Sequence, residues 1–116
     1  QKEYEILTAE ISKATFGVTP SEYKKLKGLK RQNLRDHMND LELIFNMLGE
    51  RVTTEISQQE KPDTFVENKK VAERGGSIAG NARKQTEKEL GRPIVPKENY
   101  LPKSEDKKKL KSGFGF

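Results

Sequence analysis

The residue types that can perform acid–base chemistry gather in one short stretch. Asp36, the only histidine (His37) and Asp40 fall within one helical turn, and the two aspartates are spaced to share a helix face. A general base needs an orienting partner and a pocket. No motif that indicates a catalytic nucleophile lies near this stretch. Zero cysteines and one histidine also leave no donor set for a zinc site. We interpret the stretch as the polar start of a helix, and we expect no enzymatic activity, no metal and no cofactor.

A run of basic residues is the second chemical feature, and it lies between two predicted helices. The formal net charge is +5, and a positive excess over residues 21–35 is followed by an acidic stretch at 36–60. Such a run contacts phosphates without reading base sequence, and its affinity depends strongly on salt. The alternative interpretation is a solvated surface. The candidate nucleic-acid contacts are Lys24, Lys25, Lys27, Lys30, Arg31 and Arg35.

A pair of glycines, Gly75 and Gly76, falls inside a predicted helix, where two glycines cost about 2 kcal/mol relative to alanine. Ala72, Gly76 and Gly80 recur every fourth residue, so one face of this helix has almost no side chains. Another backbone can approach such a face closely. We interpret it as a site of tight packing between helices.

An alternative interpretation of the glycine pair is a kink, or a second helix start at Ser77. The backbone N–H groups at such a start would attract a phosphate. Arg74 and Arg83 lie on either side of this position, so we add both to the candidate nucleic-acid contacts.

Two short helices are expected at the front of the chain. The first covers residues 2–14, where apolar residues follow a helical spacing. The second begins after Thr19, because Pro20 suits the first helical position and Glu22 completes a capping box. It is expected to stop near Gly28.

Two long helices are expected to follow. Apolar residues advance by three or four positions from Leu34 to Ile56 without a break, which predicts one helix that Gly49 can bend. The next helix begins after Thr64 or Asp63 and ends at Gly91, a residue type that commonly closes helices.

The fold class that follows is all-α: two long helices packed together, a short N-terminal helical pair and an extended, basic C-terminal tail. We expect one helical domain over 1–102, the C-terminal module of a longer protein, and a disordered, lysine-rich tail over 103–116. The Leu34–Ile56 stripe is expected to pack on apolar residues of the fourth helix, Phe65, Val71, Ile78 and Ala82. The candidate core and interface residues are Leu41, Phe45, Leu48, Val52, Phe65, Gly76 and Gly80.

The composition limits the size of the core. Of 116 residues, 31% are hydrophobic and 35% are charged, so a second copy, as in a homodimer, or another partner is expected to complete the apolar surface. No apolar run is long enough to span a bilayer, so no membrane contact is expected and a cytoplasmic location is predicted.

Several stretches of this sequence resemble the C-terminal region of the DNA-damage-inducible protein D family of bacteria. The resemblance extends from about Ile6 to Leu101, and the stretches fall in the family's order. They are Tyr23–Met38, Asp40–Glu50, Thr53–Ser57, Phe65–Ala72, Gly75–Lys84 and Lys97–Leu101. The tail after Leu101 has no counterpart in the resemblance, so no role is transferred to it.

The resemblance implies a protein of the SOS response to DNA damage. Members of that family are connected with the RecA-type recombinase filament on single-stranded DNA, as modulators and not as enzymes. The family's N-terminal half, similar to phage antirepressor domains, is expected to be absent here, consistent with a first residue Gln1. The leading hypothesis is modulation of homologous recombination by binding the RecA-type filament, single-stranded DNA, or both. The alternatives are a phage-type antirepressor or transcription regulator that binds duplex DNA or a repressor, and a module that only dimerises.

Overall fold

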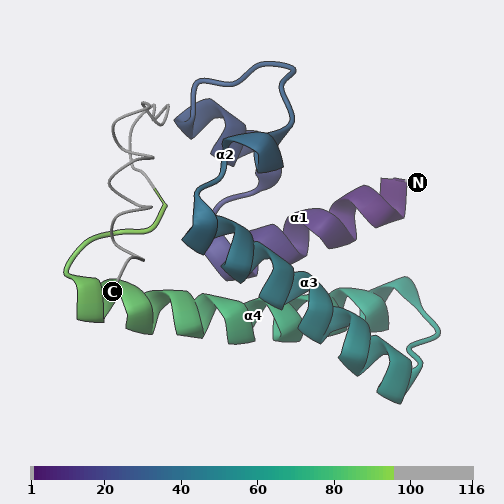
Figure 1. Cartoon of the computed structure of the whole chain (residues 1–116). Helices are drawn as coiled ribbons and strands as arrows, with labels where there is room; N and C mark the ends of the chain where they lie inside the picture. Colours follow the sequence, from purple (N-terminus) through teal and green to yellow (C-terminus); the bar gives the residue numbers. More distant parts are fainter. Residues whose placement is uncertain (1, 96–116) are drawn as a thin grey trace.

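The structure is a computed structural model, and it describes residues 2–95 (Figure 1). That part of the chain is all-helical, which confirms the predicted fold class at this level. Its elements are α1 (Lys2–Phe16), α2 (Pro20–Leu26), the 3-10 helix η1 (Leu34–His37), α3 (Asp40–Glu60) and α4 (Phe65–Leu90). None of these helices combines the length and apolar character that a bilayer crossing requires. The predicted tail at 103–116 lies outside the described residues.

Helix α4 is the central element, and both α1 and α3 pack along it (Figure 1). The contact between α1 and α4 is as extensive as the one between α3 and α4. The predicted packing of two long helices is therefore incomplete, because α1 packs against α4 as extensively as α3 does. Helix α2 and η1 lie to one side, beyond the crossing of the longer helices.

The glycines of α4 are the points where the neighbouring backbones come close. A Cβ on Gly76 would lie 2.7 Å from the Cβ of Ala14, and one on Gly80 would overlap the carbonyl oxygen of Ala14. A Cβ on Gly75 would lie 2.7 Å from the backbone of Thr53 in α3. The glycines lack side chains, so the backbones of α1 and α3 can pack closely against α4. Gly76 and Gly80 contact α1, and Gly75 contacts α3. Helix α4 runs unbroken through the pair, so the alternative of a new helix start at Ser77 is wrong.

The third helix begins later than its apolar spacing suggests. Leu34–His37 form a 3-10 helix, and Met38 is extended with a ψ of 141°. Asn39 then caps α3: its side chain accepts from the Glu42 N–H, while the Glu42 side chain accepts from the Asn39 N–H. This reciprocal cap fixes the helix start at Asp40, so the predicted continuous helix from Leu34 is wrong.

Other helix ends agree with the sequence pattern. Thr19 and Glu22 form the predicted capping box, with Pro20 in the first turn of α2. Thr64 caps α4, and Gly91 closes it in the left-handed conformation with a φ of 71°. Helix α3 ends at Glu60, and its C-cap residue is Lys61, which has a positive φ of 49°.

The buried apolar cluster joins α1, α2, α3 and the segment after α4. Its members are Phe16, Tyr23, Phe45 and Ile94, and Leu41, Leu34, Met38 and Ala82 pack against it. Of the predicted core, Phe45, Gly76 and Gly80 are buried, whereas Leu41, Leu48, Val52 and Phe65 are half-buried. Ile78 is 49% exposed, so its predicted place in the core is wrong. The face of α4 that is buried carries small residues, which leaves Ile78 at its edge.

Candidate nucleic-acid interface

The predicted basic run forms a separate part of the fold, which we call the basic lobe (residues 20–37). It consists of α2, the loop after it and η1, and it lies at the top of Figure 1. Gly28 turns the chain with a φ of 72°, and the N–H of Leu29 then donates to the carbonyl of Lys24. In the loop, the Gln32 side chain accepts from the N–H groups of Lys30 and Arg31. Local hydrogen bonds thus hold the basic loop in place.

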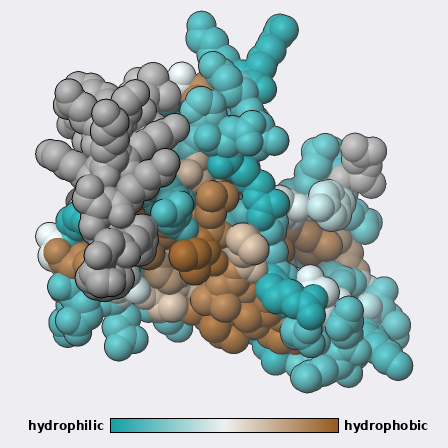
Figure 2. Space-filling view, viewed as in Figure 1, coloured by the Kyte–Doolittle hydropathy of each residue, from teal (hydrophilic) through white to brown (hydrophobic). Residues whose placement is uncertain are grey.

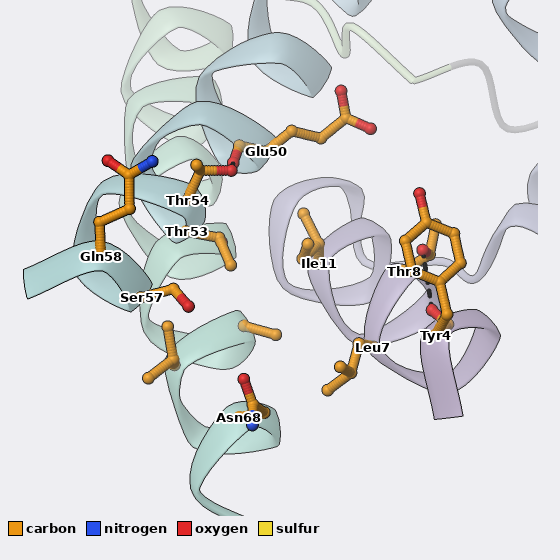
Figure 3. A pocket seen from close by; sticks show the side chains of 12 residues that line it. Tyr4, Leu7, Thr8, Ile11, Glu50, Thr53, Thr54, Ser57, Gln58 and Asn68 are labelled. Atoms are coloured by element: carbon orange, nitrogen blue, oxygen red, sulfur yellow. Dashed lines mark hydrogen bonds between the residues drawn. The ribbon is translucent and has the colours of Figure 1, made fainter. Parts of the chain in front are cut away.

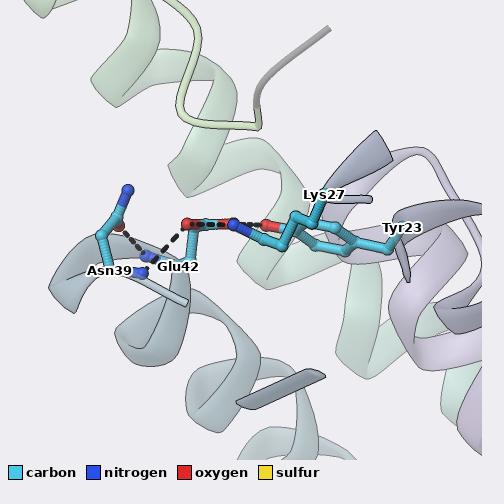
Figure 4. Close-up of polar contacts among 4 residues, drawn as sticks. All are labelled: Tyr23, Lys27, Asn39 and Glu42. Carbon is cyan, nitrogen blue, oxygen red and sulfur yellow. Dashed lines mark hydrogen bonds and ion pairs between the residues drawn. The ribbon is translucent and has the colours of Figure 1, made fainter. Parts of the chain in front are cut away.

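A buried polar cluster anchors the basic lobe to α3 (Figure 4). The Lys27 ammonium lies 3.0 Å from both carboxylate oxygens of Glu42, and both side chains are inaccessible to solvent. The Tyr23 hydroxyl donates to the same carboxylate. The Tyr23 ring also packs edge-on against Phe16, with ring centres 5.1 Å apart. Glu42 therefore caps α3 and binds α2 at once.

Burial changes the acid–base properties of both charged members of this cluster. Desolvation raises the pKa of Glu42 to about 7, and hydrogen bonding to Asn39 opposes the rise. Desolvation lowers the pKa of Lys27 to about 8. Each charge is therefore costly without the other, so loss of one partner alone should weaken the docking of the lobe on α3.

The structure brings only part of the candidate contacts to the surface of the lobe. Lys25, Lys30 and Arg31 are exposed, and Lys24 is half-buried. Lys27 lies inside the buried cluster, so its predicted role as a surface contact is wrong. Its position four residues after Tyr23 places it on the same, inward face of α2, a signal that the run of lysines obscures.

Three candidate arginines outside the lysine run, Arg35, Arg74 and Arg83, form hydrogen bonds or ion pairs within the protein. Arg35 contacts Glu50 at 3.0 Å, and Arg74 makes two hydrogen bonds of 2.8 Å to Glu60. Arg83 is buried and donates from Nε to the carbonyl of Thr15 and from a terminal nitrogen to Glu87. Of these partners, Glu50 and Glu60 lie on α3, Glu87 on α4 and Thr15 on α1. Arg74 and Arg83 therefore join helices, and the structure does not bring them to the basic lobe.

Three lysines of the lobe line a hollow of about 410 Å³, which we call the lysine hollow. Its lining residues are Pro20, Ser21, Lys24, Lys25, Leu29 and Lys30. Leu29 is buried and supplies an apolar wall, while the lysines supply positive charge. The run of basic residues did not predict Pro20, Ser21 and Leu29 as part of this site. The capping box before Ser21 and the glycine turn before Leu29 are the signals that place them beside the lysines.

A second concavity lies between α1 and α3, over α4 (Figure 3). This groove measures about 440 Å³, and Tyr4, Leu7 and Ile11 of α1 face Thr53 and Thr54 of α3 across it. The Thr54 hydroxyl donates to a backbone carbonyl of its own helix, and the Thr53 hydroxyl oxygen lies against Gly75. Because these hydroxyls turn toward the backbone, the groove is more apolar than its threonines suggest.

Apolar surface also gathers over α3 and α4, where Figure 2 shows a continuous hydrophobic area. The large apolar side chains exposed on α3 are Ile44 and Met47, and those on α4 are Val66, Ile78 and Leu90. Contiguous apolar surface of this kind commonly marks a contact with another macromolecule.

The stretch considered for acid–base chemistry does not form one helical face. Asp36 and His37 belong to η1, whereas Asp40 begins α3 after the break at Met38. Over residues 2–95, no group of three or more histidine, cysteine or acidic side chains is arranged to hold a metal ion.

Comparison with known proteins identifies no relative of this chain: no family model, no curated protein and no solved structure matches it.

Proposed function

We propose that this protein is a non-enzymatic module of the DNA-damage (SOS) response. It modulates homologous recombination by binding the RecA-type recombinase filament, the single-stranded DNA within it, or both. The resemblance to the DNA-damage-inducible protein D family supplies the biological context. The observation that carries the DNA contact is the lysine hollow on the basic lobe, with Lys30 and Arg31 exposed beside it.

The distribution of ion pairs supports the choice of this surface. Within residues 2–95, Lys24, Lys30 and Arg31 form no ion pair with a carboxylate, while Lys27, Arg35 and Arg74 each do. Cations without a nearby carboxylate attract phosphate most strongly, because no internal partner competes for them. The basic lobe is therefore the surface best suited to a nucleic-acid backbone.

Charge reversal on the lobe tests this proposal. The triple variant Lys24→Glu, Lys30→Glu and Arg31→Glu should bind labelled single-stranded DNA at least about tenfold more weakly than the wild type in low salt. Its plot of log affinity against log salt concentration should be shallower by about 2, since each lost phosphate contact removes about 0.7 for a single strand. Fluorescence anisotropy with bare and RecA-type-recombinase-coated strands gives both quantities.

A matched control carries the same change of charge elsewhere. Lys84→Glu, Lys88→Glu and Arg92→Glu alter two exposed lysines in the last turns of α4 and one exposed arginine just after it. This control should bind strands more tightly than the lobe variant. Equal losses in the two triple variants would show that net charge alone drives binding and would refute an interface on the basic lobe.

The second candidate function is protein binding without DNA contact, and the exposed Ile44, Met47 and Ile78 favour it. A module of that kind would bind the coated filament, or dimerise, with little dependence on salt. The charge-reversed lobe variant separates the two candidates, because it should lose DNA binding and keep a contact made through apolar surface.

A further inference from the structure

The lysine hollow has more structure than a phosphate contact requires. A phosphate needs only positive charge and donors, and a convex patch of lysines supplies both. Here the lysines surround a concavity of about 410 Å³, whose wall includes the buried Leu29 and Pro20 of the first turn of α2. That volume lies within the range of about 300–1,000 Å³ that is typical of small-molecule sites. The wall therefore offers contact to an apolar part of a ligand as well as to a phosphate.

We propose that the lysine hollow receives one unstacked nucleotide of a single strand. The base and sugar lie against Leu29 and Pro20, and the flanking phosphates contact Lys24 and Lys30. This inference rests on the proposed function and deepens it, because it assigns one unstacked nucleotide, and not the phosphate backbone alone, to the basic lobe.

The pairing state of the ligand follows from this geometry. In a duplex the bases are stacked and paired, so only phosphate and sugar reach a protein without entering a groove. A single strand can turn a base outward and place it against apolar side chains. The hollow is therefore filled by a single strand and only bridged by a duplex.

The absence of base selectivity follows from the hydrogen bonds of the loop. The N–H groups of Lys30 and Arg31 already donate to the Gln32 side chain, so these two backbone donors are not offered to a base edge. Apolar contact with Leu29 and Pro20 makes no hydrogen bond to a base edge, and the lysines contact phosphates in this arrangement, so neither distinguishes one base from another. We expect oligothymidine and oligoadenine strands to bind with similar affinity.

The test uses the full chain and four labelled or competing probes of equal length. These are an intact single strand, a strand with a run of abasic sites, a duplex and inorganic polyphosphate. The intact strand should bind at least about fivefold more tightly than the abasic strand, which is the gain expected when about 40 Å² of apolar surface is removed from water. Equal affinity for the intact and abasic strands would overturn the inference while leaving a phosphate-binding lobe in place.

A filling variant gives an independent check that does not change the charge. Ser21 is exposed and lines the hollow, so Ser21→Leu should occupy part of its volume without unfolding α2. The variant should lose the preference for the intact strand and keep its affinity for the abasic strand. Ser77→Leu, at an exposed serine of α4, is the matched control and should retain the preference.

The remaining outcomes are equally decisive. A duplex that binds as tightly as the single strand would contradict an unstacked base in the hollow. Failure of every probe to bind would remove the DNA contact of the proposed function itself, and the inference with it. A loss of preference in Ser77→Leu as large as that in Ser21→Leu would show that the hollow is not the site.

Discussion

At about pH 9, replacing Lys27 with methionine should lower the free energy of unfolding by about 3–5 kcal/mol, because an ionised Glu42 carboxylate would then be buried without its cation. Both side chains are inaccessible to solvent, and their ion pair joins α2 to α3. A loss of that size is a large fraction of the about 5–15 kcal/mol that stabilises a typical domain. Urea denaturation followed by circular dichroism measures it. The control is Lys24→Met on the same helix, which should change the stability by less than about 1 kcal/mol.

The pH dependence of this variant identifies the cause of the loss. Burial already raises the pKa of Glu42 from 4.5 to about 7, and removal of the positive charge of Lys27 raises it further. A group whose pKa is raised by folding contributes stability below its unfolded pKa and loses it as the pH rises through the folded pKa. The wild-type Glu42 loses its contribution by about pH 7, and the variant continues to lose stability above it. The gap between the two proteins should therefore widen above pH 7.

A double variant provides the decisive comparison for the buried pair. Lys27→Met with Glu42→Gln removes both charges, and glutamine can keep the capping contacts with Asn39. It should be more stable than Lys27→Met alone, and its melting temperature should vary less between pH 5 and pH 9. A double variant as unstable as the single variant, with unchanged pH dependence, would show that packing around Lys27, and not the buried charge, is what matters.

The parts of this fold that could be predicted are those determined by residues close together in the sequence. Thr19, Pro20 and Glu22 specify the start of α2 within four positions, and the structure has this cap. The cap at Asn39 and Glu42 is just as local and was missed, because a continuous apolar stripe across Leu34–Ile56 outweighed it. A 3.6-residue spacing of apolar residues shows which face packs against a neighbour, not where a helix begins. Here the spacing runs on through the extended Met38, which separates η1 from α3.

The candidate site was harder to predict because it depends on contacts between distant residues. The lysine run indicated the lobe, but which lysine points inward is decided by Glu42, 15 positions after Lys27. Arg83 finds its partner at the carbonyl of Thr15, 68 positions away. A sequence shows which residues are basic but not which carboxylate or carbonyl group each one contacts. Buried and exposed basic residues therefore cannot be told apart before the packing of the helices is known.

Substitution of Gly80 by alanine should destabilise the protein, although the same substitution stabilises an exposed helix. In a helix interior, alanine is favoured over glycine by about 1 kcal/mol. At Gly80, however, the added Cβ would overlap the carbonyl oxygen of Ala14, a backbone atom that no side-chain rotation can remove. Overpacking of this kind costs about 1–3 kcal/mol and occasionally more, so the strain should exceed the gain in helix propensity. Thermal and urea melts of Gly80→Ala should therefore show a net loss of stability.

The sign of this change tests the close approach of α1 to α4 directly. Ser77→Ala, at an exposed position one turn earlier in α4, adds helix propensity without meeting α1 and should leave the stability equal or slightly higher. If Gly80→Ala also stabilised the protein, α1 would not lie against this face, and the glycine repeat would need another explanation. A loss of stability in Gly80→Ala, together with no loss in Ser77→Ala, would instead show that the glycine repeat allows α1 to pack closely against α4. The position of α1 matters for the basic lobe as well, because Phe16 at the end of α1 packs against Tyr23 of the buried cluster.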